Sequence, residues 1–252
     1  MCDNNKLCEK YVDIMTMHAL GDTIGFKNGD WEFNYYEYEK FEILDDYVNE
    51  MIYEFISLGG VNGIDIKDWR VSDDTFFHIA IAESMLKFNG AVDDKFMRVV
   101  KQNLFDEMLE MYNEMHGLDG RDKFDRYMGA VTFNSINDFT PKHDSRFTEY
   151  DVRSGGNGAA MRNLAIGMCL YGEDKRKELI QVSILTSKLT HNSAYGYLAG
   201  FTSAFFTALA MEGKPIESWP SMLVEMLEAK VMKTVLALKN IDEIYDYIGY
   251  IR

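Results

Sequence analysis

The sequence predicts an all-α protein built as a compact bundle of helices. Its 252 residues include only three prolines but 16 methionines. Proline breaks helices, whereas Met and the frequent Leu, Ala, Glu and Lys of this chain favour them. A chain of this length can bury the core of one large domain, and no repeat or low-complexity tract divides it. We therefore expect a single domain over residues 1–252.

Apolar residues at spacings of three and four predict a series of helices along the chain. The expected ranges are 9–22, 41–58, 73–88, 94–116, 158–171, 174–188, 192–212 and 219–239. Gly59 should end the second of these, because glycine is common just beyond a helix. Residues 117–153 lack the pattern and predict a long irregular loop, which in a compact domain is usually functional or partly disordered. Small residues along 192–212 predict a tightly packed central helix.

Charge and cysteine content exclude several classes of protein. A net charge of −15 and a pI of about 4.7 disfavour nonspecific binding to nucleic acids, which requires clustered Lys and Arg. The three cysteines, Cys2, Cys8 and Cys169, are odd in number and lack the spacing of a zinc knuckle, so we expect a reduced compartment. We expect Cys169 to be a small core residue. No signal core or membrane-spanning run is present, which predicts a cytoplasmic protein.

The stretch Ser72-Asp73-Asp74 lies where an apolar helix is expected to begin. Ser and Asp are good N-cap residues, and acids are favourable in a first helical turn. Two adjacent carboxylates also repel each other, which a hard cation such as Mg²⁺ would relieve. The residues alone leave both interpretations open: a helix cap and nothing more, or a metal site.

A glycine-rich loop precedes another expected helix. It consists of Ser154, Gly155, Gly156, Asn157 and Gly158. Backbone amides at such a place bind phosphate readily, although a flexible loop before a helix is an equal alternative. Arg162 could pair with a phosphate or form a salt bridge inside the fold, and we favour the structural role. His191 could donate to a ligand or be a structural residue.

Several segments, in this order and at these separations, resemble the ADP-ribosylglycohydrolase family. The segments span residues 19–26, 28–33, 69–75, 154–162 and 189–197. They include Asn-Gly-x-Trp-Glu-Phe and Trp-Arg-Val-Ser-Asp-Asp-Thr, which are most similar to the ADP-ribosylarginine hydrolase branch. The resemblance extends from about residue 9 to about residue 230, which is most of the chain.

The resemblance implies a hydrolase that removes ADP-ribose from arginine on proteins by Mg²⁺-dependent cleavage of an N-glycosidic bond. Its partners would be an ADP-ribosylated protein or ADP-ribose. Ser72, Asp73 and Asp74 would bind Mg²⁺, and Asp73 or Asp74 would also handle a proton. Glu32 would guard the site as a gate. The loop 154–158 would hold the diphosphate and distal ribose with His191 nearby, so we expect the helix starts near residues 73, 159 and 192 to meet at one cleft.

One feature of the family is absent from the sequence. The family builds a centre of two Mg²⁺ ions from Ser/Thr-Asp-Asp and from a later Asp-x-Asp-Ser/Thr motif. After Asp74, no two aspartates are two positions apart. We therefore expect a domain incomplete at its C-terminus, with the second Mg²⁺ site in doubt. A catalytically impaired relative that binds ADP-ribose, or one half of a split enzyme, is the alternative, with self-association or a C-terminal half as partner.

Overall fold

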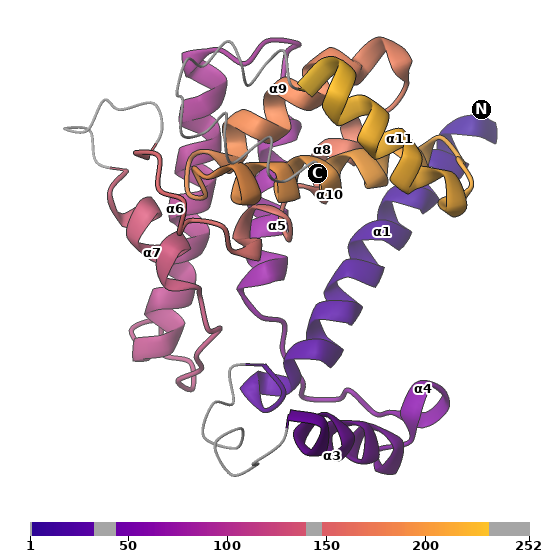
Figure 1. Ribbon diagram of the computed structural model, residues 1–252. Coiled ribbons are helices and arrows are strands. Elements are labelled where there is room, and N and C mark those ends of the chain that lie inside the picture. The colour runs from indigo at the N-terminus through magenta and orange to yellow at the C-terminus, as the bar shows by residue number, and fades with distance from the viewer. Residues whose placement is uncertain (1, 33–43, 140–147, 232–252) are drawn as a thin grey trace. The chain divides into compact units, whose positions relative to one another are not determined.

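The computed structural model describes residues 2–32, 44–139 and 148–231. Regular secondary structure in these ranges is helical and contains no strand, so the predicted all-α class is confirmed (Figure 1). The chain divides into two compact units, the first formed by residues 1–75 and 114–127, the second by residues 76–113 and 128–252. The expectation of a single domain stays a prediction.

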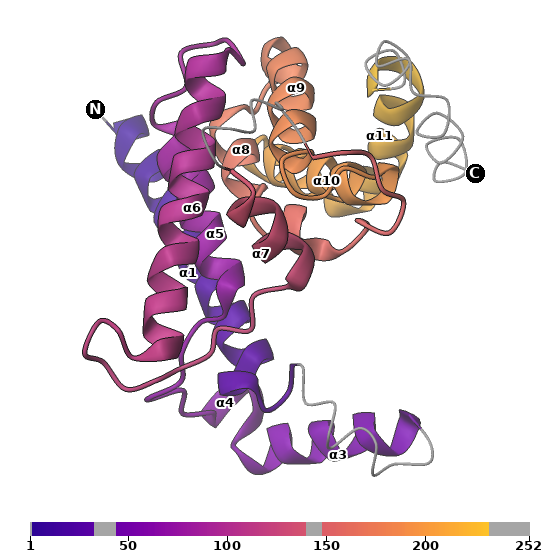
Figure 2. The same ribbon diagram turned by 90° about the vertical axis from the view of Figure 1, so that its left-hand side faces the viewer.

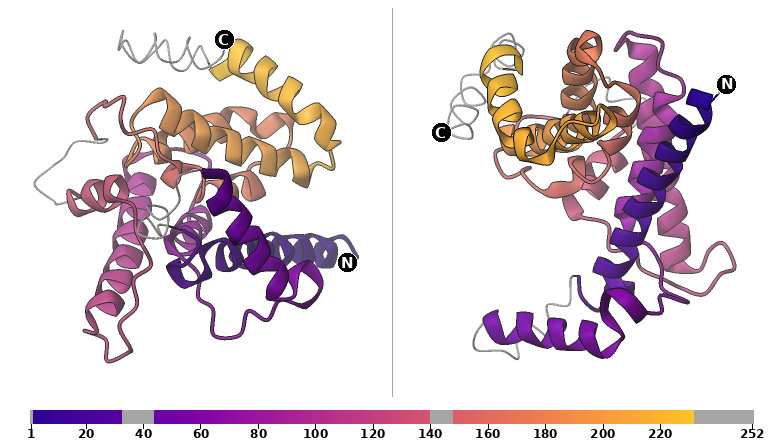
Figure 3. Two further views of the ribbon diagram at one scale, coloured as in Figure 1. Left: turned by 60° about the horizontal axis from the view of Figure 1, so that its bottom comes forward. Right: turned by 90° about the vertical axis from the view of Figure 1, so that its right-hand side faces the viewer.

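Among its described residues, the first unit contains three whole helices and the start of another. These are α1 (Cys2–Phe26), α3 (Leu44–Ser57), α4 (Gly60–Gly63) and the first residues of α5 (Asp73–Met85). Figures 1 and 3 show α3 beside the C-terminal end of α1, after the short 3-10 turn Lys27–Gly29. Glu54 on α3 forms an ion pair with Lys27 and accepts a hydrogen bond from Nε1 of Trp31 at 2.7 Å. These contacts hold the backbone next to Glu32.

The second unit contains the rest of α5 and most of the apolar core. The other helices among its described residues are α6 (Asp94–His116), α7 (Ala130–Asn137), α8 (Leu164–Cys169), α9 (Arg176–Ser187), α10 (Ala194–Met211) and α11 (Trp219–Met226). Short 3-10 turns lie at Asn157–Ala159, Glu173–Lys175 and Ile216–Ser218, and a π turn lies at Leu227–Val231. Helix α6 crosses both units, since its last residues, 114–116, belong to the first.

Helix α10 packs against α8 and α9 (Figure 2). The approach is so close that a Cβ at Gly200 would lie 2.2 Å from Oγ of Ser187. A Cβ at Gly167 of α8 would lie 2.1 Å from the carbonyl oxygen of Ala204. A methyl group cannot fit at these distances without movement of the backbone. The predicted tightly packed central helix is therefore confirmed.

Three expectations about the fold are corrected. The helix expected over 158–171 is wrong: α8 begins only at Leu164, and the carbonyl of Gly158 accepts the guanidinium of Arg162 at 2.8 Å. The stretch 117–153 is not wholly irregular, because it contains α7. Cys169 is exposed at the end of α8 instead of buried in the core. Parts of the helices expected at 41–58 and 219–239 lie outside the described residues.

Among the described residues, no helix combines the length and the apolar character that crossing a bilayer requires.

Candidate functional site

The start of α5 is fastened to α1 by the carboxylate of Asp22. Oδ1 of Asp22 accepts a hydrogen bond from Oγ of Ser72 at 2.6 Å, and Oδ2 accepts one from Oγ1 of Thr75 at 2.5 Å. The backbone N–H groups of Ser72 and Thr75 donate to the same carboxylate. Oγ of Ser72 in turn accepts the N–H of Asp74 at 3.1 Å. The predicted helix cap is therefore present, and the carboxylate of Asp22 supports it from outside the helix.

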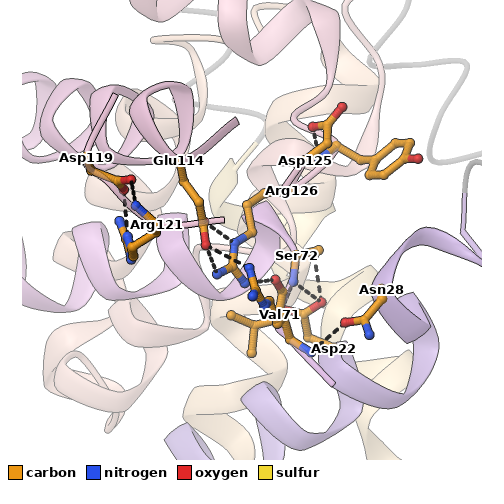
Figure 4. A network of polar contacts seen from close by, with 11 residues as sticks. Asp22, Asn28, Val71, Ser72, Glu114, Asp119, Arg121, Asp125 and Arg126 are labelled. Atoms are coloured by element: carbon orange, nitrogen blue, oxygen red, sulfur yellow. Dashed lines mark hydrogen bonds and ion pairs between the residues drawn. The ribbon is translucent and has the colours of Figure 1, made fainter. Parts of the chain in front are cut away.

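A second contact holds the residues just before α5 (Figure 4). Glu114 is 2% exposed, and its carboxylate accepts two hydrogen bonds from Arg126, at 2.8 and 3.1 Å, and one from Arg70 at 3.2 Å. Nη1 of Arg126 donates to the carbonyl of Val71, and the carbonyl of Arg126 accepts the N–H of Asp73 at 3.1 Å. Fork-shaped contacts between arginine and a carboxylate impose a defined geometry. The backbone at 71–73 is thereby fixed.

The guanidinium groups of Arg70 and Arg126 also lie over the ring of Phe124, with centroid distances of 4.5 and 4.9 Å. The backbone N–H of Arg70 donates to Oδ1 of Asn28 at 2.8 Å. We call Arg70, Glu114 and Arg126 the arginine clamp. Glu114 accepts hydrogen bonds from both arginines, so its negative charge partly neutralises their positive charges. The two arginines therefore stabilise the ionised acids of α5 less than unpaired arginines would.

The carboxyl groups of Asp22, Glu32 and Asp74 interact at the start of α5, and we call these three residues the acidic region. Burial raises the pKa of Asp74 to about 7, with further increases from the charges of Asp22 and Glu32. The pKa of Glu32 is also raised, mainly by burial and then by Asp22. Burial makes an ionised carboxylate unfavourable here, and the neighbouring negative charges add to that cost. A proton or a cation would reduce that cost.

The oxygen atoms at the start of α5 are ligands of the kind that a hard cation prefers. Carboxylate and hydroxyl oxygens are the ligands that Mg²⁺ prefers, and Ser72, Asp73 and Asp74 provide both types. Oγ of Ser72 already donates to Asp22 and accepts the N–H of Asp74, which leaves one lone pair for another partner. Among residues 2–32, 44–139 and 148–231, however, no three His, Cys, Asp or Glu side chains are grouped so that they could hold a metal ion. The described residues do not form a complete metal site by themselves.

In the second unit, the glycine-rich loop lies against His191. A Cβ at Gly156 would lie 3.5 Å from Nε2 of His191, and a Cβ at Gly158 would lie 2.5 Å from Cε1 of the same ring. The carbonyl of Ser154 accepts a hydrogen bond from Oγ of Ser193 at 2.9 Å, which ties the loop to the N-cap of α10. Residues Gly155, Gly156 and Asn157 are exposed. The loop therefore presents open backbone beside an imidazole edge.

A buried cation lies beneath the same loop. Arg162 is completely buried, and its guanidinium donates to the carbonyls of Gly158 and Thr186 and to Oγ1 of Thr190. None of the ion pairs found among the described residues involves it, so the expected internal salt bridge is not seen there. Burial lowers the pKa of Arg162 to about 9. Burial and, secondarily, Arg162 lower the pKa of His191 to about 3, so the imidazole is neutral at physiological pH.

The structure brings the residues predicted from sequence into two groups. Glu32, Ser72, Asp73 and Asp74 lie in the first unit, with Asp73 buried and Asp74 half-buried. The residues of the loop 154–158 contact one another and His191 in the second. The expectation that the helix starts near 73, 159 and 192 meet at one cleft stays a prediction. One premise is corrected: the loop leads into the 3-10 turn Asn157–Ala159 and not into a long helix, so the dipole of a following helix does not support the anion binding predicted for the loop.

Sequence reasoning missed the residues that support these groups. Glu114 had no signal in the sequence beyond its place in the last turn of an amphipathic helix. Arg126 lies within residues 117–153, which were predicted to form a functional loop. That prediction was the one sign in the sequence that Arg126 contributes to the site. Thr190 directly precedes His191, but its role depends on a contact with Arg162, 28 positions earlier. Asp22 is half-buried and anchors the start of α5 through Ser72.

Comparisons with known proteins show the family of the chain. A family described as ADP-ribosylglycohydrolase matches residues 3–249. An ADP-ribosyl glycohydrolase of Acanthamoeba polyphaga mimivirus is 34% identical over 219 residues, which cover 87% of this chain and 40% of the viral protein. An ADP-ribosylhydrolase of Dictyostelium discoideum is 30% identical over 235 residues, which cover 90% of this chain and 54% of that protein. The chain thus spans about half the length of these relatives.

Proposed function

Because the chain belongs to the ADP-ribosylglycohydrolase family, we propose that it is a hydrolase that removes ADP-ribose from arginine side chains of modified proteins. The observation that carries the proposal is the acidic region at the start of α5. Asp22 and the arginine clamp hold this region in place, and Asp74 has a pKa of about 7. The specificity for arginine rests on the resemblance around residues 28–33 and 69–75.

The reaction breaks the bond between the anomeric carbon of the ribose and a guanidine nitrogen. Water supplies a hydroxyl group to the carbon and a proton to the departing guanidine. A carboxyl group with a pKa near 7 can hold or release a proton at neutral pH, which general acid–base catalysis requires. We assign this task to Asp74, with Asp73 as the alternative. The pKa of Glu32 is raised by burial and then by the charge of Asp22. In this proposal Glu32 would guard the approach of the ribose.

Mg²⁺ is the cofactor in this proposal, held by Ser72, Asp73 and Asp74. The ion would supply Lewis-acid polarisation of a ribose oxygen when bound. The chain's own contribution is to place two adjacent carboxyl groups at a fixed helix start, with the Asp22 carboxylate and the clamp preventing their displacement. Further oxygen ligands must come from water or from residues outside the described ranges. The family's second Mg²⁺ belongs to the same proposal.

The loop 154–158 and His191 would hold the ADP-ribose part of the substrate. Exposed backbone at Gly155 and Gly156 can approach a diphosphate closely, because no side chain intervenes. The positive charge of buried Arg162 lies directly behind this loop, with its guanidinium on the carbonyl of Gly158. A fixed cation in a buried place acts on a nearby anion more strongly than an exposed one does. The diphosphate would therefore lie next to a positive charge.

Release of ADP-ribose from an arginine-modified protein tests the proposal directly. Wild-type protein should release ADP-ribose with Mg²⁺ present and lose this activity in EDTA. Asp74→Asn, which keeps the size of the side chain, should lower the rate by at least about a hundredfold, a typical contribution of acid–base catalysis. Asp46→Asn, on the exposed surface of α3, is the matched control and should keep the wild-type rate. Equal rates for wild type and Asp74→Asn would contradict the assignment.

A second candidate is recognition of ADP-ribose without turnover. The absence of a group of three metal ligands among the described residues favours it. Saturable binding of ADP-ribose with no release from modified protein would select this function. A partner that carries an Asp-x-Asp-Ser/Thr motif, or a second copy of the chain, would then be proposed to complete the site. Sedimentation velocity with and without such a fragment, followed by the release assay, tests that partner.

A further inference from the structure

Thr190 lies between a buried guanidinium and an imidazole ring. Nη2 of Arg162 donates to Oγ1 of Thr190 at 2.8 Å, and the same oxygen lies 2.8 Å from Nδ1 of His191. An arginine side chain has only donors, so its contact must use a lone pair of the threonine oxygen. The direction of the second hydrogen bond then decides which nitrogen of His191 carries the proton.

The hydroxyl proton of Thr190 settles that direction. Thr190 is 1% exposed, and in the part of the chain that the structure describes its hydroxyl contacts only Arg162 and His191. If the hydroxyl donates to Nδ1, its proton is satisfied. If instead Nδ1–H donated to Oγ1, the hydroxyl would accept two hydrogen bonds and its own proton would be buried without an acceptor, which is costly.

We infer that Arg162, acting through Thr190, holds His191 as the neutral tautomer with its proton on Nε2. Arg162 is then a positioning residue, since it acts on His191 through the hydroxyl of Thr190. The low pKa of His191 agrees with this, because the ring stays neutral next to the buried guanidinium. An imidazole locked in one tautomer offers a donor whose presence does not depend on pH in the physiological range.

The Nε2–H group faces the glycine-rich loop. A Cβ at Gly158 would lie 3.0 Å from Nε2, and one at Gly156 would lie 3.5 Å from it. Any larger residue at these positions would occupy the space in front of the donor. The inference thus deepens the proposed function, on which its ligand rests: the donor would bind a ribose or phosphate oxygen of ADP-ribose, and glycine at positions 156 and 158 keeps side chains away from the donor.

Nitrogen NMR of the ring tests the tautomer without any ligand. Long-range proton–nitrogen spectra of the full chain distinguish protonated from unprotonated ring nitrogens, and His191→Gln assigns the signals. Wild type should show Nε2 protonated and Nδ1 unprotonated. Thr190→Ser, which keeps the hydroxyl, should keep that pattern, whereas Thr190→Val, which has nearly the same shape without it, should show a mixture. Arg162→Met should also give a mixture, and the Thr190 pair decides the question if that variant does not fold.

Calorimetric titration with ADP-ribose supplies the second readout. Thr190→Val should bind about tenfold more weakly than Thr190→Ser, the size expected for one hydrogen bond. A wild-type ring protonated on Nδ1, or a Thr190→Val ring that keeps the wild-type pattern, would overturn the inference. If wild-type protein has the Nε2–H tautomer but binds no ADP-ribose, the tautomer stands and the proposed ligand of the loop fails instead. The two readouts therefore separate the inference from the function on which its ligand rests.

Discussion

At the start of α5, burial and then the charges of Asp22 and Glu32 raise the pKa of Asp74 to about 7. At His191, burial and then the charge of Arg162 lower the pKa of the imidazole to about 3, so the ring is neutral. Both regions are built next to the start of a helix, yet their charges are opposite. The contrast shows that a helix terminus alone does not decide what binds there; the buried side chains behind it do. One region favours a cation or a proton, and the other favours an anion.

The largest expected effect comes from the support of the acidic region. Glu114→Gln removes the charge that balances Arg126, which is 8% exposed. Breaking a buried ion pair in this way should lower the free energy of unfolding by about 3–5 kcal/mol. Urea denaturation measures it, and Glu50→Gln on the exposed surface of α3 should change stability by less than about 0.5 kcal/mol. Equal stability of both variants would show that the clamp does not hold the start of α5.

Acid should destabilise the protein through His191. Its pKa is about 3 in the folded protein against an ordinary 6.5, so between these values the unfolded state binds more protons. Stability from this group is complete above pH 6.5 and is lost as pH falls toward 3. The loss should reach about 3 kcal/mol at pH 4. Urea denaturation between pH 7 and 4 should show a shallower decline for His191→Gln than for wild type, while exposed His116→Gln should follow wild type.

The acidic region should respond to pH with the opposite sign. The pKa of Asp74 is about 7 in the folded protein against an ordinary 3.8, so the folded state binds more protons between these values. Stability from Asp74 is complete below pH 3.8 and is lost as pH rises through 7. After allowance for solvent screening, Asp74→Asn should be about 2 kcal/mol more stable than wild type at pH 8 and equal to it near pH 4. Urea denaturation in EDTA would show this. A difference independent of pH would mean that Asp74 titrates normally.

A smaller effect is expected from the helix cap. Ser72→Ala removes the acceptor for the N–H of Asp74 and one donor to Asp22. The free energy of unfolding should fall by about 1 kcal/mol, as for other lost N-caps. Ser57→Ala, at the exposed end of α3, is the control for losing a serine hydroxyl and should cost less. If both variants lose the same amount, the contact with Asp22 adds nothing to the cap.

Local patterns in the sequence predict where α5 begins. They do not predict the arginine clamp that holds this helix start. Ser72 and Asp73 mark the start of α5 because cap preferences act over a few neighbouring residues. The clamp joins Arg70 to Glu114, 44 positions later, and no local pattern encodes a contact of that separation. The same limit explains Thr190, whose role depends on Arg162.

The helix expected over 158–171 failed for a related reason. Its apolar residues have the right spacing, but tertiary contacts override that pattern. Gly158 gives its carbonyl to the Arg162 side chain, and Asn163 donates to the carbonyl of Ser183. Helix α10 was predictable because its small residues reflect packing along its whole length. Cys169 was misplaced because the short α8 ends there.

Separate titrations with Mg²⁺ and ADP-ribose test the division between the two regions most directly. Isothermal calorimetry should show that Asp74→Asn loses at least about tenfold in Mg²⁺ affinity while binding ADP-ribose within about threefold of wild type. His191→Gln should do the reverse, keeping Mg²⁺ binding and losing about tenfold in ADP-ribose affinity. Variants that weaken both ligands equally, or neither, would contradict the account in which a carboxylate region takes the cation and the Arg162–His191 region takes the anion.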